Sequence, residues 1–237
     1  MTPRGPCYNA RQPGRRTVLR GALAVGAGAL AAVPLAGCAS REGRNVSSPN
    51  VQPQTPGSSN PGTSGNRVLL AYFSRAGENY RYGGRVDLKV GNTQVVAEMI
   101  AAWAAVDTYR IEAADPYPDD YEETVARNVR EEQDNARPKI AGRLPSLNGY
   151  STILLGSPVL NVQEPMIMRT FIEGLDWAGK TVHPLVTYAV SGMGNVQRDY
   201  AQFLSDAVVS DGLAVQGETV RDSLPQVQAW LRRINLA

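Results

Sequence analysis

Arg67-Val68-Leu69-Leu70-Ala71-Tyr72-Phe73-Ser74 is a continuous apolar run that ends in a small polar residue. A run without alternation is typical of a strand that is buried on both faces, as in a parallel sheet covered by helices. Four further strands are predicted at Thr108–Ala113, Thr152–Gly156, Thr181–Ala189 and Leu213–Gln216. Because helical patterns separate the strands, the sheet is expected to be parallel.

Apolar residues recur with helical spacing between and after these strands. The expected helices are Gln94–Ala105, Tyr121–Asn135, Pro165–Glu173, Gln197–Ser210 and Leu224–Arg233. Thr93 is the expected N-cap of the first helix, and Trp103 is expected on its buried face. The alternation predicts an α/β fold, a doubly wound five-stranded parallel sheet with right-handed crossovers and helices on both faces.

Composition and charge exclude several classes of function. The 237 residues include one His and two Cys, and both Cys precede residue 39. A Cys/His zinc site, a disulfide framework and Cys–His catalysis therefore lack their residues, and no metal site is expected. Residues 67–237 carry 17 Lys and Arg against 21 Asp and Glu, so no basic footprint for nucleic acid is predicted.

The first 66 residues have the pattern of an export signal followed by a tether. Arg15-Arg16 precedes an Ala/Gly-rich stretch at 21–33, and Leu35-Ala36-Gly37-Cys38 follows. The stretch is shorter than the roughly 20 apolar residues of a membrane span, and the order of these features resembles a twin-arginine signal peptide with a lipobox. We predict a signal peptide over 1–37, a lipidated Cys38 with a flexible Ser/Pro/Gly linker over 38–66, and a folded domain over 67–237. The alternative is an ordinary extension with a chance Arg pair.

The first loop at the carboxyl ends of the strands predicts an anion site, because ligands of doubly wound sheets bind at this edge. It begins Ser74-Arg75-Ala76-Gly77 and ends Gly91-Asn92-Thr93 at a helix N-terminus, which favours negative charge. A P-loop Lys and a Gly-x-Gly-x-x-Gly motif are both absent, so a single phosphate monoester is predicted rather than a nucleoside triphosphate or a dinucleotide. The middle, Glu78–Val90, is predicted to be an inserted hairpin that pairs around Gly83-Gly84.

Two further loops are expected at the same edge of the sheet. Pro and small polar residues in Ser157–Val162 can present backbone groups to the edge of a flat ligand. The glycines of Thr187–Asn195 permit close approach of the backbone. The three loops together indicate one ligand.

These motifs resemble the flavodoxin-like FMN-binding family, in the subgroup whose phosphate loop reads Tyr-Phe-Ser-Arg-x-Gly. The resemblance extends from Val68 to about Leu204. It is carried by Ala71–Gly77, Gly91–Thr93, Leu155–Pro158, Pro165–Phe171 and Asp176–Thr181. It implies a flavodoxin-like strand order of 2-1-3-4-5, with FMN as the cofactor at the switch point.

The resemblance also implies three groups of cofactor contacts. The phosphate would be held by Ser74, Arg75, Ala76, Asn92 and Thr93. One side of the flavin would be lined by Ser157, Pro158, Val159, Leu160 and Asn161, and the other side by Tyr188, Ser191, Gly192 and Gly194. Two features depart from the family pattern: the insertion splits the phosphate loop, and Leu160 stands where many relatives have Trp.

The resulting hypothesis is an FMN-binding lipoprotein that works with an unidentified redox partner. It would transfer electrons or reduce a small quinone-like acceptor outside the cytoplasmic membrane. No catalytic side chain is assigned, because the flavin supplies the redox chemistry. One alternative is a non-catalytic flavodoxin-shaped binding or scaffold lipoprotein, which the split loop and Leu160 motivate. Another is a hydrolase that uses His183, although a His inside a strand favours a structural role.

Overall fold

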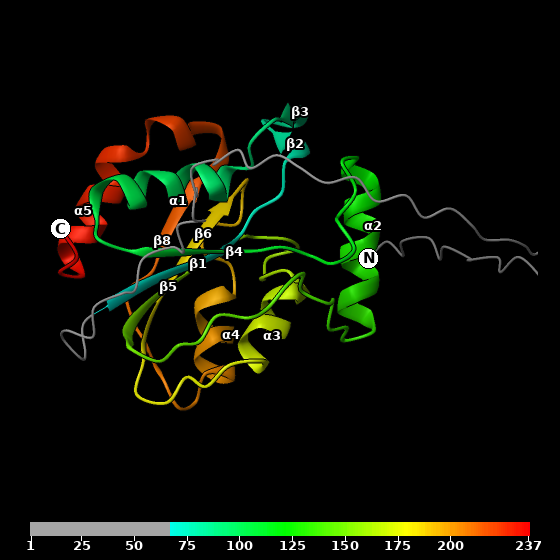
Figure 1. The fold of residues 1–237 in the computed structure, drawn as a ribbon. Coiled ribbons are helices and arrows are strands. Elements are labelled where there is room, and N and C mark those ends of the chain that lie inside the picture. Colours follow the sequence, from blue (N-terminus) through cyan, green and yellow to red (C-terminus); the bar gives the residue numbers. More distant parts are fainter. Residues whose placement is uncertain (1–66) are drawn as a thin grey trace, which may run out of the picture. The chain divides into compact units, whose positions relative to one another are not determined.

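The computed structural model describes residues 67–237, which form a central parallel sheet with helices around it (Figure 1). The predicted signal peptide, Cys38 and the linker lie outside the described residues. The strands of the sheet are β1 (Arg67–Phe73), β4 (Asp107–Ile111), β5 (Tyr150–Pro158), β6 (Thr181–Tyr188), β7 (Val208–Val209) and β8 (Leu213–Gln216). Their order is β4-β1-β5-β6, and both β7 and β8 then pair with β6. The five predicted strands correspond to β1, β4, β5, β6 and β8, and numbered in chain order they lie in the sheet as 2-1-3-4-5. The predicted fold class and strand order are therefore confirmed.

Two layers of helices cover the sheet. The helices are α1 (Asn92–Trp103), α2 (Tyr121–Gln133), α3 (Met166–Glu173), α4 (Val196–Phe203) and α5 (Leu224–Arg233), with a short 3-10 helix η1 (Gly217–Asp222). Successive β1 side chains alternate between the layers: Leu69 and Ala71 pack with α3 and α4, whereas Val68 and Leu70 pack with α1 and α5 (Figure 1). A strand covered on both faces explains why β1 is apolar throughout.

Helix α2 differs from the other four because it covers neither face of the sheet. None of its side chains belongs to either apolar core, and its buried residues are the polar Thr124, Asn128 and Glu131. It stands at one end of the sheet, beside the small hairpin of β2 (Gly77–Arg81) and β3 (Gly84–Leu88) (Figure 1). Within residues 67–237, no helix combines the length and apolarity needed to cross a bilayer.

Three local predictions were wrong. Gly91, not Thr93, is the N-cap of α1, because the helix begins two residues earlier than expected. Trp103 is the last residue of α1 and its side chain is 54% exposed, so it does not belong to the core. The helix predicted over Gln197–Ser210 ends at Phe203, because the chain turns back and the β-branched pair Val208-Val209 joins β6 as β7.

The inserted hairpin is present, with its turn one residue earlier than predicted. Tyr82 and Gly83 form the turn and both have positive φ, of 46° and 83°. Gly84, predicted to lie in the turn, is the first residue of β3 and pairs with Arg81. The hairpin forms a separate two-stranded sheet rather than extending the central one.

Candidate functional site

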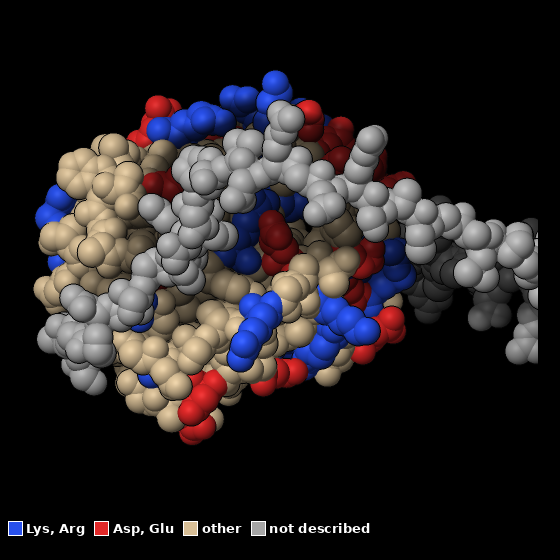
Figure 2. Space-filling model, viewed as in Figure 1, with Lys and Arg blue, Asp and Glu red and all other residues tan. Residues whose placement is uncertain are grey.

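A cavity of about 320 Å³ lies at the carboxyl ends of the strands; we call it the edge cavity. Nine predicted site residues line it: Ser74, Arg75, Asn92, Thr93, Pro158, Val159, Leu160, Asn161 and Tyr188. All three predicted loops thus contribute to one site. Figure 2 shows basic and acidic side chains interspersed over the described part of the face seen in Figure 1.

Five predicted site residues do not line the edge cavity. Ala76 borders an adjoining cavity of about 290 Å³, beside β4. Ser157 is fully buried in the sheet, one residue before the second loop turns outward. Ser191, Gly192 and Gly194 belong to the third loop but lie outside the lining of the edge cavity.

The two halves of the predicted phosphate loop meet despite the insertion between them. The Ser74 hydroxyl accepts a hydrogen bond from the Gln94 backbone N–H at 3.0 Å, and so caps α1 from the end of β1. A Cβ on Gly91 would collide with the carbonyl oxygen of Arg75 and with Ser74 Oγ, so this close approach requires glycine. The first N–H groups of a helix lack partners within the helix, so the start of α1 presents donors that suit an anion.

Arg75 ties the first loop to the segment that precedes α2. Its Nη1 donates to the carbonyls of Ala76, Pro118 and Asp119, and its Nη2 donates to the carbonyl of Glu78. Burial lowers the pKa of this guanidinium below its ordinary value. Arg75 therefore directs both terminal nitrogens to backbone carbonyls, although it also borders the edge cavity.

A buried pair of hydroxyls joins the start of α1 to the end of β6. Thr93 Oγ1 and Thr187 Oγ1 lie 2.7 Å apart, and both side chains are buried at the lining of the edge cavity. The Val159 N–H donates to the Thr187 carbonyl at 2.9 Å. The first, second and third loops are therefore connected through Thr187.

The second loop contains a tight turn in a strained conformation. The backbones of Leu160 and Gln163 exchange two hydrogen bonds, and the residues between them, Asn161 and Val162, have φ of 48° and 63°. A β-branched residue rarely adopts a positive φ, so Val162 is a strained position next to the cavity. Asn161 Nδ2 donates to Glu132 Oε2 at 2.6 Å, which ties this turn to α2.

The third loop packs directly on that turn. Asn195 N–H donates to the Val162 carbonyl at 2.7 Å. Gly194 has φ of 57°, and a Cβ on it would collide with the same carbonyl oxygen. Gly194 therefore brings two loops together instead of facing the cavity.

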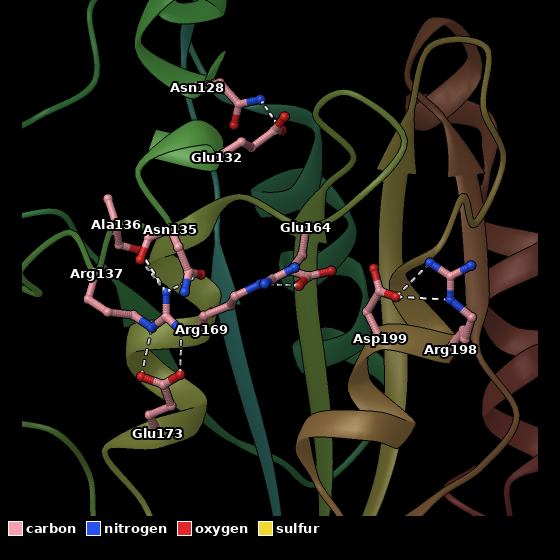
Figure 3. A network of polar contacts seen from close by, with 10 residues as sticks. All are labelled: Asn128, Glu132, Asn135, Ala136, Arg137, Glu164, Arg169, Glu173, Arg198 and Asp199. Atoms are coloured by element: carbon pink, nitrogen blue, oxygen red, sulfur yellow. Dashed lines mark hydrogen bonds and ion pairs between the residues drawn. The ribbon is translucent and has the colours of Figure 1, made fainter. Parts of the chain in front are cut away.

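Helix α2 and the hairpin form a wall of the edge cavity that was not predicted from the sequence. The edge cavity is also lined by Phe73, Asn79, Tyr80, Tyr117, Tyr121, Thr124, Val125, Asn128, Val129, Thr187, Ala189, Gly217 and Glu218. Asn128 donates to Glu132, and its Oδ1 is buried with no hydrogen-bond partner (Figure 3). The available sequence signal was Val125 and Val129, an apolar i,i+4 pair on an otherwise charged helix.

Several contacts hold the hairpin across this edge of the sheet. The Glu78 N–H donates to the Asp119 carbonyl at 2.7 Å, and Arg85 forms an ion pair with Glu122 at 2.7 Å. Arg85 also lies over the ring of Tyr121, with 3.7 Å from its Cζ to the ring centroid. On the other side, the Tyr82 N–H donates to Glu218 Oε1 at 3.2 Å. The hairpin therefore spans from α2 to η1.

His183 lies apart from this site. Its Nδ1 is 2.9 Å from the Asp211 carbonyl oxygen, and its ring meets Trp230 edge-on at 6.3 Å between centroids. It lines neither cavity. The structure places it in the layer between β6 and α5, which gives no support to the hydrolase hypothesis.

A doubly wound parallel sheet with a cavity at the carboxyl ends of its strands is the architecture of many nucleotide-binding α/β proteins. Comparison with known protein families shows which family within that class the chain matches. The model of the flavodoxin family matches residues 87–234, more than half of the chain, and the chain belongs to this family. Family membership supports FMN as the cofactor. The matched region begins inside β3, so β1 and most of the hairpin precede it.

Two solved structures of candidate flavoproteins show the same fold. A candidate flavoprotein from Bacteroides eggerthii is 28% identical, with a TM-score of 0.59, and the match covers 73% of this chain and 100% of that one. A candidate flavoprotein from Bacteroides uniformis is 28% identical, with a TM-score of 0.56 and coverage of 71% and 99%. A Lactobacillus acidophilus flavoprotein in complex with FMN is 17% identical, with a TM-score of 0.48 and coverage of 68% and 99%. None of the curated proteins matches the chain.

Proposed function

We propose that the chain binds FMN in the edge cavity and transfers electrons, or reduces a small quinone-like acceptor, outside the cytoplasmic membrane. The observation that carries this proposal is the meeting of Ser74, Gly91 and the start of α1, which brings together the two halves of the predicted phosphate loop. The second and third loops stand beside it and border the same cavity.

The residues present fit the cofactor. The phosphate would lie at the N-terminus of α1, next to Ser74, Asn92 and Thr93. The flavin ring would lie between Pro158–Asn161 and Tyr188. Arg75 would stabilise this loop through its carbonyl contacts rather than by pairing with the phosphate. When bound, FMN supplies the one- or two-electron chemistry, and the chain supplies binding and orientation.

Apolar side chains on the α2 side of the cavity suit contact with a flat, largely apolar acceptor. Leu160 replaces the aromatic residue expected on the second loop, and Val125 and Val129 of α2 face the same cavity. Such side chains offer dispersion contacts to a planar ring without demanding hydrogen bonds. A quinone would accept two electrons and two protons there and leave as the hydroquinone, with electrons delivered by a partner protein or by reduced nicotinamide that binds transiently.

Binding is tested by mixing the full-length chain with FMN and measuring the retained flavin after desalting. We expect about one FMN per chain, with quenched flavin fluorescence. Replacement of Thr93, whose hydroxyl pairs with Thr187, by a bulky Tyr should abolish retention by filling the cavity. The matched control is Thr108→Tyr on the exposed edge strand β4, which should keep the flavin.

Electron transfer is tested on the same preparation. The bound flavin is reduced with dithionite without oxygen, and a short-chain naphthoquinone is then added in slight excess. We expect reoxidation of the flavin absorbance at a rate that depends on quinone concentration. Larger side chains at Val125 should slow this rate more than they weaken FMN binding. Flavin that stays reduced in the presence of the quinone would restrict the function to electron transfer with a protein partner.

The location of the protein belongs to the same proposal and rests on the sequence of residues 1–66. The Arg15-Arg16 pair, the apolar stretch and Cys38 favour export by a twin-arginine route and a lipid on Cys38. Labelling with a radioactive fatty acid should mark the wild-type chain and leave Cys38→Ser unlabelled and released from membranes. Replacement of both Arg15 and Arg16 by Lys should leave the chain in the cytoplasm.

A further inference from the structure

A group of polar side chains is buried directly beneath the second loop. Glu164 lies two residues beyond that loop and is fully buried, and its Oε1 lies 3.1 Å from Arg169 Nε. Its other oxygen, Oε2, has no hydrogen-bond partner, and the buried Ser157 Oγ and Tyr200 Oη also lack one. Figure 3 shows Glu164 between Arg169 on one side and Asp199 on the other. Buried polar groups without partners are costly, so their retention here calls for a reason.

These groups come from the elements that support two loops of the site. Ser157 begins the second loop on β5, and Glu164 follows the loop just before α3. Tyr200 lies on α4, the helix that follows the third loop. Burial raises the pKa of Tyr200, and the Glu164 and Asp199 carboxylates raise it further. The Tyr200 hydroxyl therefore lies within electrostatic reach of Glu164.

Glu164 also links α3 to α4 through its partner. Arg169 lies on α3, its side chain is 18% exposed, and its guanidinium lies over the Phe203 ring of α4 at 4.5 Å from the centroid. Burial raises the pKa of Glu164, and the Arg169 guanidinium opposes that shift. Removing one member of a mostly buried ion pair leaves the other charge without compensation. The end of the second loop is thus held by an interaction that both helices share.

We propose that Glu164 is a positioning residue for the flavin: its carboxyl holds the second loop against α3 and α4, and so fixes the wall that Pro158–Asn161 presents to the edge cavity. This inference rests on the proposed function, because the flavin is what that wall would contact. Glu164 itself does not line the cavity and acts through the loop.

The test compares Glu164→Gln with Glu173→Gln in the full-length chain. Glu173 is a close match, since it also pairs with an arginine, Arg137, at 2.7 Å and ends α3, but its side chain is 53% exposed (Figure 3). Three quantities are measured: amide hydrogen exchange of 159–163 without FMN, the Kd for FMN, and the visible circular dichroism of bound flavin. For Glu164→Gln we expect about tenfold faster exchange, about tenfold weaker FMN binding and altered flavin dichroism. For Glu173→Gln we expect no change.

A second pair of variants covers the case in which Glu164→Gln does not fold. Arg169→Gln removes the partner of Glu164 and leaves the loop sequence unchanged, and we expect about threefold weaker FMN binding with the same change in dichroism. The control is Arg137→Gln, which breaks the more exposed pair with Glu173 and should change neither quantity.

The outcomes separate this inference from the proposed function. If the wild-type chain binds FMN, and Glu164→Gln keeps the wild-type Kd and dichroism while only its melting temperature falls, Glu164 is merely structural and the inference is overturned. If the wild-type chain retains no FMN, the proposed function fails, and the positioning role fails with it even where loop exchange is faster.

Discussion

The two faces of the sheet bury different kinds of residue. On the face covered by α1 and α5, the buried polar groups have partners: His183 contacts the Asp211 carbonyl and the Ser223 hydroxyl donates to the Val220 carbonyl. On the face covered by α3 and α4, Ser157, Glu164 and Tyr200 keep atoms without partners beneath the second loop. The buried polar groups on the α1 and α5 face therefore stabilise the fold. On the α3 and α4 face, hydrogen bonds are missing where the sheet supports the second loop.

Unpartnered polar atoms are also found in the lining of the edge cavity. Among the described residues, six buried side-chain atoms have no hydrogen-bond partner. Ser157, Glu164 and Tyr200 contribute three of them, and Asn128 and Glu218, which line the cavity, contribute two more. Backbone strain at Val162 lies in the same region. Locally unfavourable features therefore gather around the site, as expected where function competes with stability.

The largest effect on stability should come from the face covered by α1 and α5. Trp230 on α5 is the largest fully buried side chain, so Trp230→Ala should lower the free energy of unfolding by about 3–5 kcal/mol. Urea unfolding followed by far-ultraviolet circular dichroism measures the loss. Because Trp230 lies away from the loops, the folded variant should bind FMN with a Kd within about twofold of wild type. Loss of FMN by a fully folded variant would contradict the separation of the two faces.

The next effect is local to the first loop. Gly91→Ala places a Cβ against the Arg75 carbonyl oxygen and Ser74 Oγ, so the halves of the loop must separate. We expect a loss of about 1–3 kcal/mol in stability and at least about tenfold weaker FMN binding. Gly84→Ala is the control, since the nearest atom to its Cβ is 3.5 Å away and its φ is ordinary. Isothermal titration calorimetry with FMN measures the affinity of both variants. Equal FMN affinities of Gly91→Ala and Gly84→Ala would contradict the close contact between the two halves of the loop.

A smaller effect of opposite sign is expected in the second loop. Val162→Gly relieves a left-handed conformation that valine disfavours, and should raise the free energy of unfolding by about 1 kcal/mol. Val190→Gly is the matched control, because Val190 is an exposed valine of the third loop without a positive φ. Val190→Gly should lower the free energy of unfolding slightly, because glycine increases the conformational entropy of the unfolded chain. Urea midpoints that move the same way in both variants would show that Val162 is not strained.

The smallest effect is a pair of opposite pH dependences at two glutamates, Glu164 just before α3 and Glu173 at its end. Burial raises the pKa of Glu164, so its contribution to stability is present below about pH 4.5 and is lost as the pH rises through its folded-state pKa. The hydrogen bond from Arg137 lowers the pKa of Glu173, so its contribution is present above about pH 4.5 and is lost on acidification. Urea unfolding of wild type, Glu164→Gln and Glu173→Gln across pH 4–8 tests both signs. If the free energy of unfolding of wild type exceeded that of Glu164→Gln by an amount that grows with pH, the predicted pH dependence of Glu164 would be contradicted.

The fold could be predicted because its strands are continuous apolar runs that admit few alternatives. The predicted β1 and β8 match the observed bounds, and the site loops followed from where parallel strands must end. The role of α2 could not be predicted, because Val125 and Val129 mark one face of the helix but do not show which edge of the sheet that face borders. Gly91 was missed as the N-cap because its role depends on Ser74, which is distant along the chain. Contacts of that kind are tertiary and leave no local pattern.

The most direct test of FMN binding is a visible absorption spectrum of the full-length chain after incubation with FMN and desalting. We expect the flavin bands to be retained at about one FMN per chain, with quenched fluorescence, in wild type and in Trp230→Ala but not in Gly91→Ala. A wild-type chain that is folded by circular dichroism and yet emerges colourless would contradict the assignment of the edge cavity to FMN.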